Sequence, residues 1–265
     1  MIFFFFVGEL LVDNVALTDL QGQRHLTAQG AEPLTPGAPP ARVDLRRGTT
    51  RAYGAQGAYT LTATVDGGRF ELTTTPGRGA VLHHTDGYQA HPFGGYTYYY
   101  SRPRLGVTGT VSIDGVAMSV QGESWFDHQW GDLQPAIAAG WDWFGIHLDD
   151  GRQLMLLLAH PPGQPLFVDG TLVDARCGAA PVDPTTARVR SARRWTSPDS
   201  GCTYPLGWDL TVGDLNLTVT PAFAAQEVIN AADPQRSYWE GVAQVTGDVT
   251  GRAYVELVGY CRTPP

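Results

Sequence analysis

The sequence predicts an all-β protein of antiparallel strands, arranged as a barrel or a sandwich. Apolar and polar residues alternate in "YTLTATV" (59–65), "VTGTVSI" (107–113) and "LNLTVT" (215–220), the pattern of half-buried strands. Asp-Gly or Gly-Asp pairs at 66–67, 114–115, 150–151 and 213–214 indicate tight hairpin turns. No window of ten or more residues shows a convincing helical period.

The remaining segments fit this fold class. The apolar opening "MIFFFFVGELLVDN" lacks the basic start and the cleavage site of a signal peptide, and it is too short to span a bilayer. We therefore expect a strand there, no stable membrane insertion and a cytoplasmic location. Segments 29–57 and 170–205 are rich in Pro, Gly and Arg, which predicts long loops or lids with short strands.

Composition excludes several function classes. The chain has 265 residues and a net charge of −8, which argues against binding nucleic acid or anionic membranes. All 18 basic residues are Arg, so neither a Schiff-base lysine nor a phosphate-binding P-loop lysine is available. Arg-only usage favours a GC-rich bacterial genome. No G-x-G-x-x-G follows a strand and opens a helix, and no G-x-S-x-G elbow indicates a serine nucleophile.

Three cysteines, at 177, 202 and 261, are an odd number without a C-x-x-C pair. This spacing indicates neither a disulfide framework nor a zinc site. A single bridge between Cys177 and Cys202 is the alternative that the sequence leaves open.

The stretch "GESWFDHQWGD" (122–132) is the main candidate for chemistry. On a strand, Trp125 and Asp127 share one face, and His128 and Trp130 share the other. If Asp127 points into a barrel, desolvation keeps its carboxyl protonated as an acid, and neighbouring indole faces stabilise a cation. The alternative is structural: Asp127 accepts backbone hydrogen bonds at a turn, and His128 packs.

Two neighbouring clusters extend this candidate site. In "GGYTYYYSRPR" (94–104), Tyr96, Tyr98 and Tyr100 share a face, either as the lining of an apolar pocket or as a cross-strand aromatic ladder. Arg102 or Arg104 could instead pair with Asp127 or Glu123, which would weaken an acid role for Asp127.

The second cluster, "VLHHTDGYQAHPFGG" (81–95), carries His83, His84 and His91. Adjacent histidines on a strand face opposite ways, so we expect no metal site. A histidine beside the cavity, hydrogen-bonded to a substrate or to Asp127, is the favoured interpretation.

A faint internal repeat divides the chain. "VQGESWFD" (120–127) aligns without a gap to "VTGRAYVE" (249–256), which pairs Asp127 with Glu256, and "FFFFVGELLVD" (3–13) resembles "WDWFGIHLDD" (141–150). The boundary falls near 135–140. We interpret Glu256 as an internal scaffolding residue.

The stretches "YYYSRPRLGVTGTVSIDG", "VQGESWFDHQWG", "GWDWFGIHLDDGRQLMLLL", "RRWTSPDSGCTYPLGWDL" and "YWEGVAQVTGDVTGRAYVELVGY" resemble, in the same order, the signature regions of the lipocalin-like carotenoid 1,2-hydratase and AttH family. The resemblance implies two tandem lipocalin-like antiparallel β-barrels, expected at 1–138 and 139–265. It also implies cofactor-free enzymes on apolar small molecules, including hydratases and decalin-forming Diels–Alderases.

We therefore expect an enzyme acting on a hydrophobic polyene, terpenoid or polyketide. Asp127 and His128 are the expected catalytic residues, and the expected binding residues are Trp125, Trp130, Tyr96, Tyr98, Tyr100, His84 and Trp143. As an acid-dependent hydratase or cyclase it would use Asp127 as proton donor; as a pericyclase it would rely on the shape of the cavity. The alternatives are a carrier of an apolar ligand and an inactive relative. The oligomeric state is not predicted.

Overall fold

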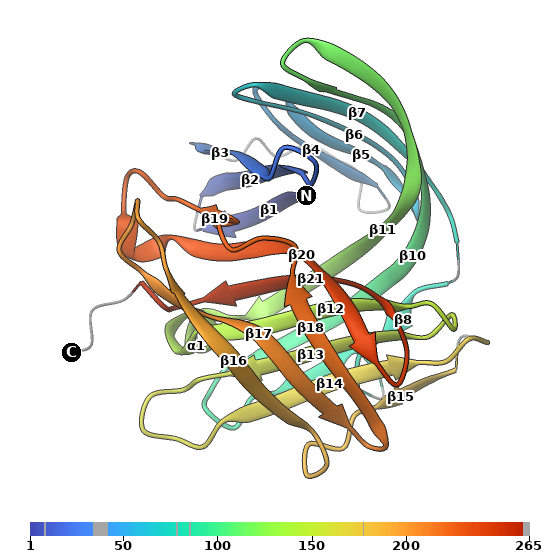
Figure 1. The fold of residues 1–265 in the computed structure, drawn as a ribbon, viewed down its shortest axis with the longest axis vertical. Coiled ribbons are helices and arrows are strands. Elements are labelled where there is room, and N and C mark those ends of the chain that lie inside the picture. Colours follow the sequence, from blue (N-terminus) through green and yellow to red (C-terminus); the bar gives the residue numbers. More distant parts are fainter. Residues whose placement is uncertain (8, 34–41, 78, 85, 177, 262–265) are drawn as a thin grey trace. The chain divides into compact units, whose positions relative to one another are not determined.

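The computed structural model describes residues 1–7, 9–33, 42–77, 79–84, 86–176 and 178–261. It confirms the all-β fold: nearly all of its regular structure is antiparallel strand (Figure 1). Within the described residues, the helical segments are one short helix, α1 (Gln134–Ala139), and one 3-10 turn, η1 (Pro234–Arg236).

Contacts within the chain group it into two compact units. Unit 1 comprises residues 1–79 and 104–126, and unit 2 comprises residues 80–103 and 127–265. The long strands β10 (Tyr96–Ile113) and β11 (Val116–Asp132) contribute residues to both. The expected division into barrels at residue 138 stays a prediction.

Unit 1 contains a three-stranded sheet in the order β1-β2-β3 and the strands β4 to β7, which continue onto β10. Its small core consists of Val15, Ala63, Val65 and Phe70, which come from β2, β6 and β7. The strands are β1 (Ile2–Val7), β2 (Leu10–Asp19), β3 (Arg24–Pro33), β4 (Val43–Arg47), β5 (Thr50–Ala55), β6 (Ala58–Val65) and β7 (Gly68–Thr75).

Unit 2 contains a curled ten-stranded sheet in the order β15-β14-β13-β12-β21-β20-β18-β17-β16, with β19 on β20 (Figure 1). The short strands β8 (Val81–Leu82) and β9 (Tyr88–Ala90) pair with β10. The ten strands are β12 (Trp141–Leu148), β13 (Gln153–Ala159), β14 (Phe167–Val173), β15 (Ala179–Pro181), β16 (Arg188–Thr196), β17 (Thr203–Val212), β18 (Leu215–Pro221), β19 (Glu227–Val228), β20 (Tyr238–Gly247) and β21 (Gly251–Val258).

The alternation along these strands separates two faces of the sheet. One face buries the large core of unit 2, where Phe144, Trp208 and Trp239 are almost completely inaccessible. Residues one position away from core residues therefore point to the opposite face. That second face carries Trp143 on β12 and its register partner Glu256 on β21, and it holds the candidate site.

The four predicted turns all connect paired strands. Asp114 and Gly115 join β10 to β11 with φ angles of 50° and 82°, which a two-residue hairpin with a left-handed backbone requires. Segment 170–205 departs from the expectation of mostly loop, because β16 runs for nine residues and pairs with β17. Residues 34–41 of the other expected loop lie outside the described residues.

Candidate active site

The tyrosine row of β10 faces the opposite way from the expected one. Tyr96 and Tyr98 are 41% and 40% exposed, whereas Tyr99 is 5% exposed and Ser101 is 1% exposed. The alternation was predicted correctly, but the face assigned to the interior was wrong, because Tyr99 and Ser101 are the residues that point inward. Participation of Tyr96, Tyr98 and Tyr100 in substrate binding stays a prediction.

The exposed rings form an aromatic ladder with β11. Tyr98 stacks on Trp130 with ring centroids 5.4 Å apart, and His128 lies 4.7 Å from the same indole. Tyr100 contacts His128 edge-on at 5.3 Å. His128 thus lies on the face of β11 opposite Asp127, as strand alternation dictates, and its catalytic role remains a prediction. Trp125 is half-buried and belongs to unit 1.

Asp127 is the acceptor at the centre of a hydrogen-bond network in unit 2. Tyr99 OH donates to its Oδ2 at 2.9 Å, and Ser101 Oγ donates to its Oδ1. Asp127 is exposed, so the expectation of a dry carboxyl is wrong. Asp127 lies on β11, the edge strand of its sheet, and it stays accessible while two donors from β10 hold it. Hydroxyl donors stabilise a charged carboxylate.

Trp143 supports the network from β12. Its indole Nε1 donates to Tyr99 OH at 3.1 Å. The ring lies over Gly145, where an added Cβ would stand 2.4 Å from the ring edge, so only glycine leaves room for it. Burial, and then the charge of Asp127, raise the pKa of Tyr99 well above its usual value. Tyr99 therefore keeps its proton and acts as a donor.

His83, not the predicted His84, joins this network. Its ring bridges Thr171 Oγ1 at 2.8 Å and Ser101 Oγ at 2.7 Å, and burial lowers its pKa to about 4. Since the one proton of Ser101 goes to Asp127, Nε2 of the neutral His83 ring donates to Ser101, and Nδ1 accepts from Thr171. Sequence reasoning could not distinguish the two histidines, because it did not show which one faces β14.

His84 points elsewhere. Its Nε2 lies 3.2 Å from a carboxylate oxygen of Asp169, and its backbone has a φ of 58° at the turn after β8. Its predicted contact with a substrate stays a prediction. Of the alternatives for the arginines, Arg104 pairs with Glu123 at 3.2 Å in unit 1.

A second group of carboxyls lies on the same face of the sheet. Glu256 on β21 is half-buried and accepts a hydrogen bond from Trp141 Nε1 at 3.2 Å. Its pKa rises to about 7, mainly because burial disfavours the charged form, and the charge of Asp127 adds to this. Glu240 stands directly opposite Glu256 on β20. The sequence predicts a scaffolding role for Glu256. The internal repeat that aligns Glu256 with Asp127 is the sequence signal that could have indicated a place in the site.

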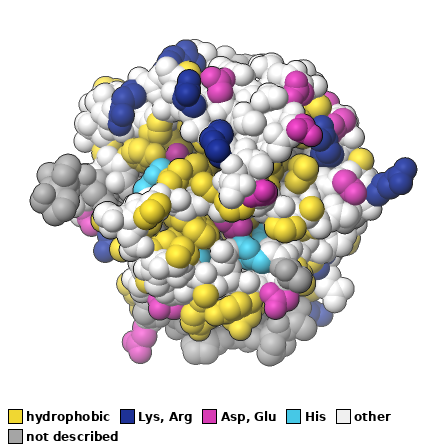
Figure 2. Space-filling model, turned by 90° about the horizontal axis from the view of Figure 1, so that it is seen from below, with side chains coloured by type: hydrophobic (Ala, Val, Ile, Leu, Met, Phe, Trp, Pro, Cys, Tyr) yellow, Lys and Arg dark blue, Asp and Glu magenta, His cyan; other side chains and the backbone are white. Residues whose placement is uncertain are grey.

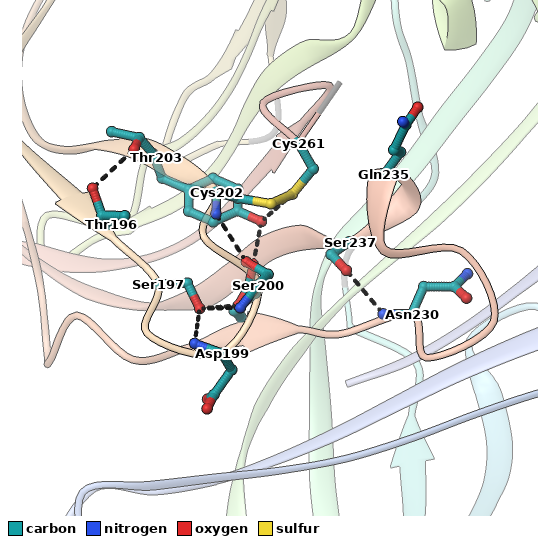
Figure 3. The surroundings of a disulfide bond; sticks show 12 residues. Thr196, Ser197, Asp199, Ser200, Cys202, Thr203, Asn230, Gln235, Ser237 and Cys261 are labelled. Carbon is teal, nitrogen blue, oxygen red and sulfur yellow. Dashed lines mark hydrogen bonds between the residues drawn. A yellow bond between two sulfur atoms is a disulfide. The ribbon is translucent and has the colours of Figure 1, made fainter. Parts of the chain in front are cut away.

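The cysteines differ from the expectation. Cys202 forms a disulfide with Cys261, which ties the end of β21 to the start of β17 (Figure 3). The alternative Cys177–Cys202 bridge is therefore wrong, and Cys177 lies outside the described residues. Beside the bridge, Glu227 accepts hydrogen bonds from Ser197, Ser200 and Tyr204. Cys202, Cys261 and Glu227 are also the group with metal-ligand proximity among the described residues, but both thiols are used in the disulfide.

The pocket, the surface charges and the helices bear on the remaining predictions. An open pocket of about 420 Å³ in unit 1 is lined by residues 75, 106–108 and 121–123, and it includes none of the predicted site residues. The expected aromatic cavity therefore stays a prediction. On the face in Figure 2, acidic and basic side chains are interspersed, and no basic patch of the kind that binds nucleic acid is visible there. Among the described helices, none has the length and apolar character to cross a membrane.

Comparison with known proteins places the chain in a family. The chain is similar to a protein of Nitrosomonas europaea whose crystal structure is described as an AttH, with 27% identity, a TM-score of 0.84, and coverage of 95% of this chain and 82% of that one. Kievitone hydratase from Nectria haematococca has a similar fold at 18% identity, with a TM-score of 0.83 and coverage of 97% and 82%. No curated protein matches the chain. The AttH-like family model matches residues 5–260, so the protein belongs to the AttH-like family.

Proposed function

We propose that the protein is a cofactor-independent enzyme that adds water to, or cyclises, a hydrophobic polyene, terpenoid or polyketide by acid–base catalysis. The observation that carries this proposal is the accessible carboxylate of Asp127, held by Tyr99 and Ser101. The hydratase activity named for the structural neighbour from Nectria haematococca, and membership of the AttH-like family, support the same reaction class.

The geometry supports a role for Asp127 as a proton acceptor. Adding water to a double bond requires a proton on one carbon and removal of a proton from the attacking water at the other. A carboxylate that already accepts from two fixed hydroxyls, and is open to solvent, is suited to orient that water and take its proton. Tyr99 and Ser101 fix both oxygens, and the indole of Trp143 faces the same region, where an aromatic ring can stabilise a carbocation.

Substitution of Asp127 tests the proposal. Purified protein is incubated in heavy-oxygen water with a panel of isoprenoid alkenes and prenylated phenols, and products are identified by mass spectrometry. Label incorporation indicates hydration, and an isomer of unchanged mass indicates cyclisation. We expect Asp127→Asn to lose about a hundredfold or more of the turnover, the usual range for general acid–base catalysis.

The matched control is Asp209→Asn. Asp209 is an exposed strand aspartate of the same unit whose carboxylate also accepts from a hydroxyl, that of Thr218 at 3.0 Å. We expect this variant to keep full turnover. A folded Asp127→Asn variant with full turnover would refute the acid–base role and favour pericyclic catalysis by shape. Saturable binding with recovery of an unchanged ligand would instead identify a carrier.

A further inference from the structure

Two carboxyls face each other across the strands β20 and β21. Glu240 and Glu256 are direct register partners in this antiparallel pair, so their side chains lie on the same face of the sheet. Directly opposed residues have Cβ atoms about 4.5–5.5 Å apart, close enough for like charges to repel strongly. The neighbouring register partner of Glu256 on its other side is Trp143, which supports the Asp127 network.

The surroundings of the pair offer little compensation for two negative charges, since Glu256 is half-buried and accepts one hydrogen bond, from Trp141. Glu240 is only 7% exposed, and its Oε2 is buried without a hydrogen-bond partner. The hydroxyl of Tyr254 is also buried without a hydrogen-bond partner, and Tyr238 lies beside Glu240, where its hydroxyl lowers the pKa of Glu240 in part. Among the described residues, no arginine or histidine side chain forms an ion pair with either glutamate. Two charged carboxylates are therefore strongly disfavoured here, as in other carboxyl pairs that share one proton.

The protonation energetics agree with this geometry. Burial, followed by the charge of Glu256, raises the pKa of Glu240 well above its usual value. Burial also raises the pKa of Glu256 to about 7. Of the other ionisable groups that act on the pair, Asp127, Tyr238 and Tyr254 are negative or neutral at pH 7, and the positive N-terminal amine lowers the pKa of Glu240 only in part. The protons thus belong to the pair as a unit and not to one residue.

A structural carboxyl in the same unit looks different. Glu227 accepts from three hydroxyls, those of Ser197, Ser200 and Tyr204, so both of its oxygens are satisfied. Glu240 keeps an orphan oxygen, although satisfied buried polar groups are the rule. The contrast favours a role in chemistry for the glutamate pair over a role in packing.

We propose that Glu240 and Glu256 share a proton at neutral pH and that Glu256, the more accessible of the two, donates it to the substrate bound at Asp127. This inference rests on the proposed function for its substrate. In hydration, the O–H bond of Glu256 breaks as a C–H bond forms on the alkene. Water then attacks the cation and gives its proton to Asp127. Return of that proton from Asp127 to the glutamate pair restores the starting state, and the net change is addition of one water.

The shared proton can be tested by a measurement that does not depend on enzyme turnover. Infrared difference spectra of the protein alone are recorded as the pH is raised through neutrality. We expect a protonated-carboxyl band at pH 7 that is absent from the double variant Glu240→Gln/Glu256→Gln. The control Glu71→Gln, an exposed strand glutamate of unit 1, should keep the band. Near-ultraviolet circular dichroism verifies that each variant is folded. A shift of the band in heavy water identifies it as a protonated carboxyl, and this measurement uses the unmodified protein alone.

Turnover of the same proteins then tests proton donation. The double variant should lose about a hundredfold or more of the turnover, whereas Asp127→Asn should lose turnover but retain the infrared band. Absence of a protonated-carboxyl band from the unmodified protein at pH 7, or an unchanged band in the double variant, would overturn the shared proton. A band that disappears with full turnover retained would overturn donation by Glu256 while leaving the role of Asp127 intact.

Discussion

Replacing Glu256 by glutamine should make the stability of the protein depend differently on pH. The pKa of Glu256 rises from its ordinary value of 4.5 to about 7 on folding. A carboxyl that binds its proton more tightly in the folded protein loses stabilising free energy as the pH rises from the unfolded pKa to the folded one. Glutamine is neutral throughout, so it does not pay this ionisation cost.

The magnitude follows from the same values. A pKa difference of about 2.5 corresponds to about 3 kcal/mol at about 1.4 kcal/mol for each pKa unit. Below about pH 4.5 both proteins carry a neutral group that can accept from Trp141, so their unfolding free energies should agree within about 1 kcal/mol. Above about pH 7, Glu256→Gln should therefore be more stable than the unmodified protein by about 3 kcal/mol.

Denaturant titrations followed by tryptophan fluorescence, repeated at several pH values, measure this difference. Contributions from groups that do not interact with Glu256, including His83, are present in both proteins and cancel. The pKa of Glu240, which the charge of Glu256 raises, falls in the variant, and this change adds to the expected gain at high pH. Glu71→Gln is the control because its side chain is exposed, and its difference from the unmodified protein should stay flat with pH. A difference between Glu256→Gln and the unmodified protein that is equally flat, or that has the opposite sign at high pH, would refute the assignment of Glu256 as a buried neutral carboxyl.

Two further outcomes are expected in unit 2. Because burial lowers the pKa of His83 from 6.5 to about 4, its stabilising contribution should be complete above about pH 6.5 and be lost as the pH falls toward 4. Nuclear magnetic resonance of its ring should show a midpoint near 4; one near 6.5 would contradict the buried bridge to Ser101. Replacing Cys202 and Cys261 by serine opens a link across 59 positions and should lower the unfolding free energy by up to about 4 kcal/mol on the chain-entropy model. Denaturation midpoints that do not change on reduction would show that the bridge is not formed.

Local chemistry made much of the fold predictable. Alternation and the Asp-Gly turns identified strands and hairpins because both depend on neighbouring residues in the sequence. Alternation also established that Tyr98 and Tyr99 lie on opposite faces of β10. It could not establish which face packs on the second sheet, because that depends on contacts with Trp143, 44 positions away. The inward-facing side of β10 was therefore assigned wrongly, while substrate binding by Tyr96, Tyr98 and Tyr100 stays a prediction.

The carboxyls of the site show the same limit. Asp127 was identified from the aromatic residues beside it in the sequence, yet its environment depends on the edge position of β11 in the sheet and on donors from β10. Glu240 and Glu256 were separated by 16 positions, and only the register of β20 and β21 brings them face to face. The disulfide was missed for a similar reason: the end of β21 returns to the start of β17, which no spacing of cysteines reveals.

Unit 2 offers two carboxyl environments, and these suit the two proton transfers that hydration requires. Asp127 is open to solvent and held by donors, conditions that suit a charged acceptor. Glu256 is half-buried next to a second carboxyl, conditions that suit a neutral donor. Each also strengthens the other, since the charge of Asp127 helps to keep the proton on Glu256. A pair of groups pushed toward opposite protonation states is the arrangement from which acid and base roles are assigned in enzymes. The proton expected on Asp127 is thus better placed on Glu256, in the segment that the internal repeat aligns with Asp127.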